Sequence, residues 1–369
     1  MSTDERICSI ALTLCPGIGH IGAKRLVSRV GSAVEIFNRR KELPQLLPSL
    51  PHSVTKALND PSILKRAEQE VAFMEQKHIT CLTLQDESYP SRLRECEDAP
   101  VALFFKGNID LNSQHVISMV GTRKATEYGK NFCMNFLKDM AELCPDVLVI
   151  SGLAYGIDIH AHTAALDNRL PTIAVLAHGL DRIYPPAHRN TAASMIEHGG
   201  LITEHLTETS PDRYNFISRN RIIAGMSDAT IVVESAAKGG ALITAELAIG
   251  YHRNCFALPG RVSDPTSTGC NRLIRDNKAA LIENAKDFIQ AMQWDTVSAK
   301  PQSVQRQLFP ELTPEETLVT QILKEEGDQH INVLVVKSNI PVNRMTALLL
   351  ELEMKGIVKA MVGGCYHLL

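Results

Sequence analysis

Short apolar runs alternate with amphipathic stretches through the middle of the chain, from residue 81 to residue 292. The runs are rich in Val and Ile and have the length of buried strands; they cover residues 116–120, 147–151, 172–177, 201–203, 230–234 and 255–258. The stretches between them, such as residues 128–143 and 161–168, have the pattern of helices. This alternation predicts an α/β fold with a parallel, doubly wound, Rossmann-like sheet.

The pattern differs at the N-terminal end of the chain. Residues 1–80 are expected to be helical, and the sequence Pro16-Gly17-Ile18-Gly19 lies there between two apolar segments. It predicts a helix–hairpin–helix (SAM-like) domain whose glycines permit a tight turn. Two interpretations of the turn stay open. Its backbone N–H groups approach a partner such as a phosphate, or it is a plain connection within a helical domain.

A polar, aperiodic stretch at residues 293–311 predicts a linker, followed by a third domain at residues 312–369. Thr313 and Glu316 form a capping box at the start of a helix. Further patterns predict a helical segment at 331–336, a helix at 342–354 and a hairpin made by 357–361 and 365–369. Three helices and a hairpin are typical of a winged-helix-like domain.

Composition narrows the class of protein. Of 369 residues, 44% are hydrophobic and 21% charged, and no apolar run reaches the roughly 18–20 residues of a membrane span. The N-terminus lacks the pattern of a secretory signal, so we expect a cytoplasmic protein without membrane contact. Nine scattered cysteines, none in a Cys-x-x-Cys pair, predict buried, reduced thiols. With a net charge of −3, a polyanion site must be a local group of Arg and Lys.

Three glycine-containing loops follow predicted strands. The first consists of Gly121, Thr122, Arg123 and Lys124; the second contains Gly152, Tyr155 and Gly156; the third contains Lys238, Gly239 and Gly240. Because the carboxyl ends of parallel strands share one edge of a sheet, the loops are expected to converge on one crevice that binds a phosphate-bearing ligand. The alternative for the first loop is an ordinary helix start with a surface arginine. The spacings match neither a dinucleotide fingerprint nor a P-loop, so no cofactor is expected.

Two arginines open the apolar segment 216–227. If the segment is helical from its start, Phe216 and Arg219 share one stripe and Arg221 points almost the opposite way. One guanidinium is then expected to be structural and the other to meet the ligand, and the pattern leaves open which. His160 and His162 are two residues apart and do not share a helix face, so no metal site is expected.

Taken together, these segments resemble the DNA-processing protein A family (DprA, also called Smf). The resemblance covers nearly the whole chain and is most specific at residues 89–90, 100–107, 120–123, 151–158, 179–185, 219–225, 240–244, 256–260 and 269–274. Two positions depart from the family pattern. Ile217 stands where Pro is usual, which leaves the start of that helix uncertain, and Gly239 where Ser is common, which removes a hydroxyl.

The resemblance implies a helical N-terminal domain, a Rossmann-like core and a C-terminal winged helix. It also implies that the core binds single-stranded DNA and forms homodimers, and that the protein loads a RecA-type recombinase onto incoming DNA during natural transformation. Carried over to this chain, the phosphate-binding residues are Gly121, Thr122, Arg123, Arg219, Asn220, Arg221 and Lys238. Phe216 and Tyr155 are candidates for stacking on bases, with core packing as the alternative. No base-reading motif is present, so little sequence preference is expected.

Two other functions remain as alternatives. The segment 239–246 loosely resembles the Gly-rich, Glu-ending loop of nucleoside-monophosphate phosphoribohydrolases, in which case Glu246 would assist glycosidic cleavage and the protein would be an enzyme. In a purely structural adaptor, the sheet edge would instead be a protein interface. The C-terminal domain has five basic and seven acidic residues from Thr313 to Leu369, a balance of −2 that favours contact with protein rather than duplex DNA.

Overall fold

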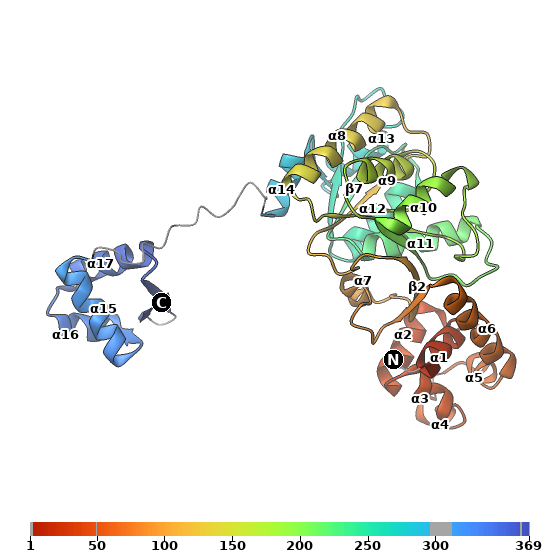
Figure 1. The fold of residues 1–369 in the computed structure, drawn as a ribbon, viewed down its shortest axis with the longest axis horizontal. Coiled ribbons are helices and arrows are strands. Elements are labelled where there is room, and N and C mark those ends of the chain that lie inside the picture. The colour runs from red at the N-terminus through yellow and green to blue at the C-terminus, as the bar shows by residue number, and fades with distance from the viewer. Residues whose placement is uncertain (1–2, 49, 296–311, 362–363, 369) are drawn as a thin grey trace. The chain divides into compact units, whose positions relative to one another are not determined.

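The computed structural model describes residues 3–48, 50–295, 312–361 and 364–368. Most of the predicted linker, 296–311, and positions 362, 363 and 369 of the predicted hairpin lie outside the described residues. The chain divides into two compact units, residues 1–298 and 299–369 (Figure 1).

The first unit begins with helices, as predicted. They are α1 (Thr3–Thr13), α2 (Gly19–Val30), α3 (Ala33–Asn38), α4 (Leu43–Leu46), α5 (His52–Leu58) and α6 (Pro61–Lys77). Their apolar faces bury Ile10, Leu12 and Ile36 completely. The same core includes Phe104 of strand β2 (Ala102–Gly107), so the helical region packs directly onto the sheet. The turn before α2 needs its glycines, because Gly17 and Gly19 have φ values of 86° and 53°.

A nine-stranded sheet forms the centre of the first unit. Its other strands are β1 (Thr80–Thr83), β3 (Val116–Val120), β4 (Leu148–Ser151), β5 (Thr172–Val175), β6 (Gly199–Thr203), β7 (Ala229–Val232), β8 (Asn254–Ala257) and β9 (Ala280–Leu281). The order is β1-β2-β6-β5-β4-β3-β7-β8-β9. The seven strands from β6 to β9 are parallel, which confirms the predicted sheet, whereas β1 and β2 add an antiparallel extension that the pattern missed.

Helices cover both faces of this sheet. The segments are α7 (Ser91–Glu95), α8 (Glu127–Leu143), α9 (Ile157–Asp167), α10 (Arg189–Glu197), α11 (Arg213–Gly225), α12 (Gly240–Gly250), α13 (Thr268–Arg275) and α14 (Ala285–Met292). One apolar cluster joins α8, α9 and α14 to the sheet, and another joins α7, α11, α12 and α13 to it. Successive strands β3 to β6 run outward in one direction, and β7 then returns to the other side of β3. The chain therefore has a topological switch point between β3 and β7.

The second unit contains α15 (Pro314–Glu326), α16 (Ile331–Ser338) and α17 (Val342–Met354), with a small antiparallel sheet of β10 (Gln329–His330), β12 (Cys365–Leu368) and β11 (Val358–Met361). The capping box of Thr313 and Glu316 is present. This arrangement confirms the predicted helices and hairpin. Among the described residues no single helix is long and apolar enough to cross a membrane. The bent pair of α16 and α17 reaches the length and apolar composition of a span only when the two helices are counted together.

Candidate functional site

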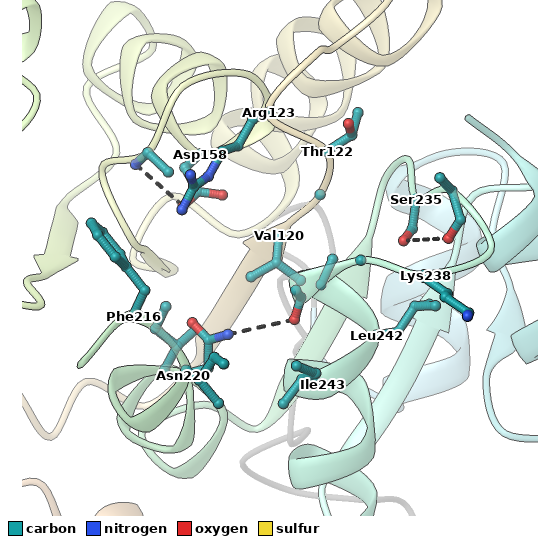
Figure 2. A pocket seen from close by; sticks show the side chains of 18 of the residues that line it. Val120, Thr122, Arg123, Asp158, Phe216, Asn220, Ser235, Lys238, Leu242 and Ile243 are labelled. Atoms are coloured by element: carbon teal, nitrogen blue, oxygen red, sulfur yellow. Dashed lines mark hydrogen bonds between the residues drawn. The ribbon is translucent and has the colours of Figure 1, made fainter. Parts of the chain in front are cut away.

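A large hollow lies at the topological switch point. We call it the switch-point cavity; it measures about 1030 Å³. It is lined by the loops that follow β3, β4 and β7 and by residues of α11 and α12 (Figure 2). Arg272 of α13 also lines it. Nine of the predicted site residues line it: Gly121, Thr122, Arg123, Phe216, Arg219, Asn220, Lys238, Gly239 and Gly240. The predicted convergence of the first and third loops is therefore confirmed.

Contacts between backbones hold the first loop in place. The N–H of Thr122 donates to the carbonyl of Glu234 at 2.7 Å, and the carbonyl of Thr122 accepts from the N–H of Ile157 at 3.1 Å. Gly121 and Gly156 have no side chains to separate these segments, since a Cβ at either position would overlap its neighbour. The side chains of Arg123 and Lys124 are exposed. Arg123 lies over the Phe216 ring, 5.2 Å from its centroid, whereas Lys124 is not among the lining residues.

Arg219 is a buried cation in the wall of the cavity. Its side chain donates to the carbonyl of Val175 at 2.6 Å, and its guanidinium fills the space that Gly152 leaves by lacking a Cβ. Burial lowers the pKa of Arg219 to about 10, with Asp158 opposing this effect, so the group stays protonated at neutral pH. Burial likewise raises the pKa of Asp158, and Arg219 opposes the change. Gly152 was expected to give room to a ligand; it gives room to Arg219 instead.

Arg221 points away from the cavity, as the helical spacing predicted. Its guanidinium forms a buried ion pair with Glu204 and also donates to the carbonyl of Asp98 at 2.6 Å. The structure does not bring Arg221 to the cavity, because its guanidinium is already bonded to Glu204 and to the carbonyl of Asp98. Of the two arginines, Arg219 is the one that lines the cavity.

The third loop presents the N-terminus of α12 to the cavity. Gly239 is the N-cap and provides no side-chain hydrogen bond to the helix, so the first N–H groups of α12 are not capped by it. The side-chain amide of Asn220 donates to the carbonyl of Gly240 at 3.4 Å (Figure 2). Lys238 is exposed. An uncapped helix N-terminus beside a lysine is a favourable place for an anion.

The two predicted aromatic residues have different surroundings. Phe216 lines the cavity beneath Arg123, and its ring centroid is 6.0 Å from that of Tyr184. Tyr155 is 51% exposed, packs edge-on against His188 at 4.9 Å, and is not among the lining residues. The structure therefore brings Phe216, but not Tyr155, to the cavity.

Two cations at the cavity were missed from the sequence. Arg213 begins α11 directly after its N-cap Asp212, and Arg272 lies on α13. Both are exposed and line the cavity. The family-like segment 269–274 contains Arg272 and could have indicated it. Arg213 lies before the segment 216–227 and gave no signal of its own.

The lining carries a positive balance of charge. Its basic residues are Arg123, Arg213, Arg219, Lys238 and Arg272, and its acidic residues are Asp158, Asp212 and Glu246, which gives 5 − 3 = +2. Four of these cations are exposed: Arg123, Arg213, Lys238 and Arg272. Within the part of the chain that the structure describes, none of the four forms an ion pair with an acid. No group of three or more His, Cys, Asp or Glu suitable for a metal occurs among the described residues. The cavity can hold an anion larger than one phosphate.

Known protein families match both units of the chain. The family model for DNA recombination-mediator protein A matches residues 80–293, and the model for the DprA winged helix domain matches residues 303–364. Protein Smf of Escherichia coli is 33% identical over 308 residues, which cover 82% of this chain and 81% of that protein. DNA processing protein DprA of Bacillus subtilis is 35% identical over 69% of this chain and 79% of its own length.

Solved structures agree with these matches. The X-ray structure of DNA processing protein A from Streptococcus pneumoniae superposes with a TM-score of 0.61 at 29% identity, covering 79% of this chain and 98% of that one. DNA processing protein A from Helicobacter pylori, whose single-stranded DNA binding mode was the subject of its structure, gives a TM-score of 0.52 at 27% identity and covers 58% of this chain and 95% of that one.

Proposed function

Since this chain belongs to the DNA recombination-mediator protein A family, we propose that it binds single-stranded DNA in the switch-point cavity. The observation that carries the proposal is the set of four exposed cations around one hollow, none of which forms an ion pair with a described acid: Arg123, Arg213, Lys238 and Arg272. Several separated cations match a chain of phosphates better than they match a single small anion. The uncapped start of α12 adds backbone N–H donors for another phosphate.

Bases complete the interaction. Phe216 lies beneath Arg123 and next to Tyr184, and Tyr184 is 46% exposed. A base that stacks on such rings gains affinity without a requirement for sequence, since every base has a flat face. The structure of the relative from Helicobacter pylori was described for its single-stranded DNA binding mode, and this supports single-stranded DNA as the ligand.

The binding test is a titration of a fluorescent single-stranded oligonucleotide at several salt concentrations. Removing one phosphate-binding cation reduces the slope of log affinity against log salt by about 0.7 for a single strand. We expect this reduction for Arg123→Ala and Lys238→Ala. The control is Arg169→Ala, which removes an exposed arginine after α9, at the other edge of the sheet. Equal slopes in all four proteins would contradict the proposal.

The bound strand is then passed to a RecA-type recombinase, and a homodimer formed through the core presents it. The family's description as a recombination mediator supports this role. The protein acts here as a binding protein in the cytoplasm, not as an enzyme. Strand-exchange assays on DNA coated with single-stranded DNA-binding protein test the delivery step: adding this protein should shorten the lag, and an unchanged lag would contradict it.

The C-terminal unit is proposed to contact protein. Three of its five basic side chains are held by its own acids: Lys337 by Glu326, Arg344 by Glu315 and Lys355 by Glu316. This leaves little positive charge for DNA phosphates. Deleting residues 312–369 is therefore expected to leave affinity for the oligonucleotide within about twofold.

The nucleotide-cleaving alternative has one observation in its favour. Glu246 lines the cavity, where a glycosidic bond could reach it. However, its carboxylate lies 3.6 Å from the ammonium of Lys278 and is well exposed, which is a poor setting for a general acid. Incubation with adenosine monophosphate tests this function: free adenine that disappears in Glu246→Gln would establish it.

A further inference from the structure

A second cavity of about 320 Å³ opens on the same edge of the sheet. It lies between α8 and the segments that follow β8 and β9, so it shares the carboxyl edge with the switch-point cavity. Its lining consists of Tyr128, Asn131, Phe132, Asn135, Phe136, Asp139, Leu258, Pro259, Glu283 and Asn284. Its volume falls at the lower end of the range for small-molecule sites.

Hydrogen bonds link the walls of the two cavities. The hydroxyl of Tyr128 donates to the carbonyl of Pro259 at 2.7 Å. The next residue, Gly260, exchanges two hydrogen bonds with the side-chain amide of Asn271, at 3.1 and 2.9 Å. Asn271 precedes Arg272, which lines the switch-point cavity. The segment at Pro259 and Gly260 therefore connects the wall of the second cavity to that of the switch-point cavity.

The second cavity is chemically unlike the first. Its only charged residues are Asp139 and Glu283, both acidic, so it disfavours a phosphate. Tyr128 is 50% exposed and presents its ring to the cavity, and the almost completely buried side chains of Phe132, Phe136 and Leu258 form an apolar floor. Asn131, Asn135 and Asp139 follow one another at every fourth position of α8 and share one face. Among the described residues, these three side chains and Glu283 are exposed and have no hydrogen-bond or ion-pair partner.

We propose that the second cavity is a nucleobase subsite for the strand whose phosphates lie in the switch-point cavity. This inference rests on the proposed function. An apolar, aromatic surface suits the flat face of a base, and free amides and carboxylates suit its edge. Carboxylates accept hydrogen bonds from the exocyclic amino group of cytosine or adenine, whereas they face the O4 oxygen of thymine unfavourably. The subsite therefore favours bases that carry an amino group.

Oligo-dC and oligo-dT of equal length test the inference, because both are pyrimidine strands with the same number of phosphates. At neutral pH we expect oligo-dC to bind about fivefold more tightly, the ratio that one net hydrogen bond provides in a solvent-exposed groove. The double variant Asp139→Ala/Glu283→Ala should reduce this ratio to about one while binding both strands. Asn131→Ala/Asn135→Ala should weaken binding of both strands and leave the salt slope unchanged.

The matched control removes the same charge elsewhere. Asp167 and Glu197 are exposed residues at the C-terminal ends of α9 and α10, at the other edge of the sheet. Asp167→Ala/Glu197→Ala should keep the preference for oligo-dC. Equal binding of the two strands by the unaltered protein would overturn the subsite, and so would a preference that persists in Asp139→Ala/Glu283→Ala. In either case, binding that still weakens with salt would uphold the proposed binding of single-stranded DNA. Failure to bind either strand at low salt would overturn both.

Discussion

Replacing Gly152 by alanine tests whether Arg219 is held as the structure describes. A Cβ at this position would overlap the guanidinium of Arg219. The end of a long side chain usually moves aside at little cost, but Arg219 is only 3% exposed and bonded to the carbonyl of Val175. Forcing an extra methyl group into a packed site costs about 1–3 kcal/mol, and losing a hydrogen bond from a charged donor costs about 1.5–3 kcal/mol. We expect a net loss of about 3 kcal/mol in the free energy of unfolding.

Urea unfolding followed by fluorescence measures this loss. Trp294 is the one tryptophan of the chain and packs against Phe288 in the core of the first unit, so its emission reports on that unit. The control is Gly240→Ala at the start of α12, where nothing lies within 4 Å of an added Cβ. That variant should be neutral or stabilised by about 0.5 kcal/mol. A Gly152→Ala variant as stable as Gly240→Ala would refute the described packing of Arg219.

Three further predictions concern single residues. Phe216→Ala should weaken binding of single-stranded DNA by about tenfold, the loss of one stacked base, with the salt slope unchanged in the same titration. Arg221→Met should lower the free energy of unfolding by about 3 kcal/mol, because it leaves Glu204 buried without its partner, and should not alter the salt slope. Burial lowers the pKa of His162 to about 3. Since the unfolded chain takes up this proton below about pH 6.5 and the folded chain does not, stability should fall as the pH drops from 6.5 towards 3; urea unfolding across that range should show a smaller fall in His162→Asn.

Much of the parallel sheet could be predicted because each of its main strands is buried on both faces and stands out as an apolar run. Strand β3 matches its predicted range, and β4 to β8 differ from theirs by a few residues at the ends. Strands β1 and β2 were missed. β1 pairs with β2, and β2 with β6, and both pairings are antiparallel, which the expectation of a parallel sheet did not include. Strand β9 has two residues, both exposed, and therefore gives no apolar signal.

The candidate site was predictable in its loops and less so in its side chains. Gly121, Arg123 and Lys238 could be found because each lies in a loop that follows a strand and combines glycine with a cation. The separate roles of Arg219 and Arg221 depend on Val175 and Glu204, which lie on or beside neighbouring strands of the sheet. That neighbourhood follows from the strand order, which periodicity does not provide. The start of helix α11, which the sequence left uncertain, is at Arg213, because the side chain of Asp212 accepts a hydrogen bond from the N–H of Asn215.

Photocrosslinking of a single-stranded oligonucleotide that carries 5-bromodeoxyuridine tests the central claim most directly, because it identifies the peptides that touch the bases. We expect crosslinks in the peptide that contains Phe216, which lines the switch-point cavity, and their loss in Arg123→Ala at moderate salt. Crosslinks confined to residues 312–369 or to the turn at Gly17 and Gly19, with none in the core, would contradict the placement of DNA at the carboxyl edge of the sheet.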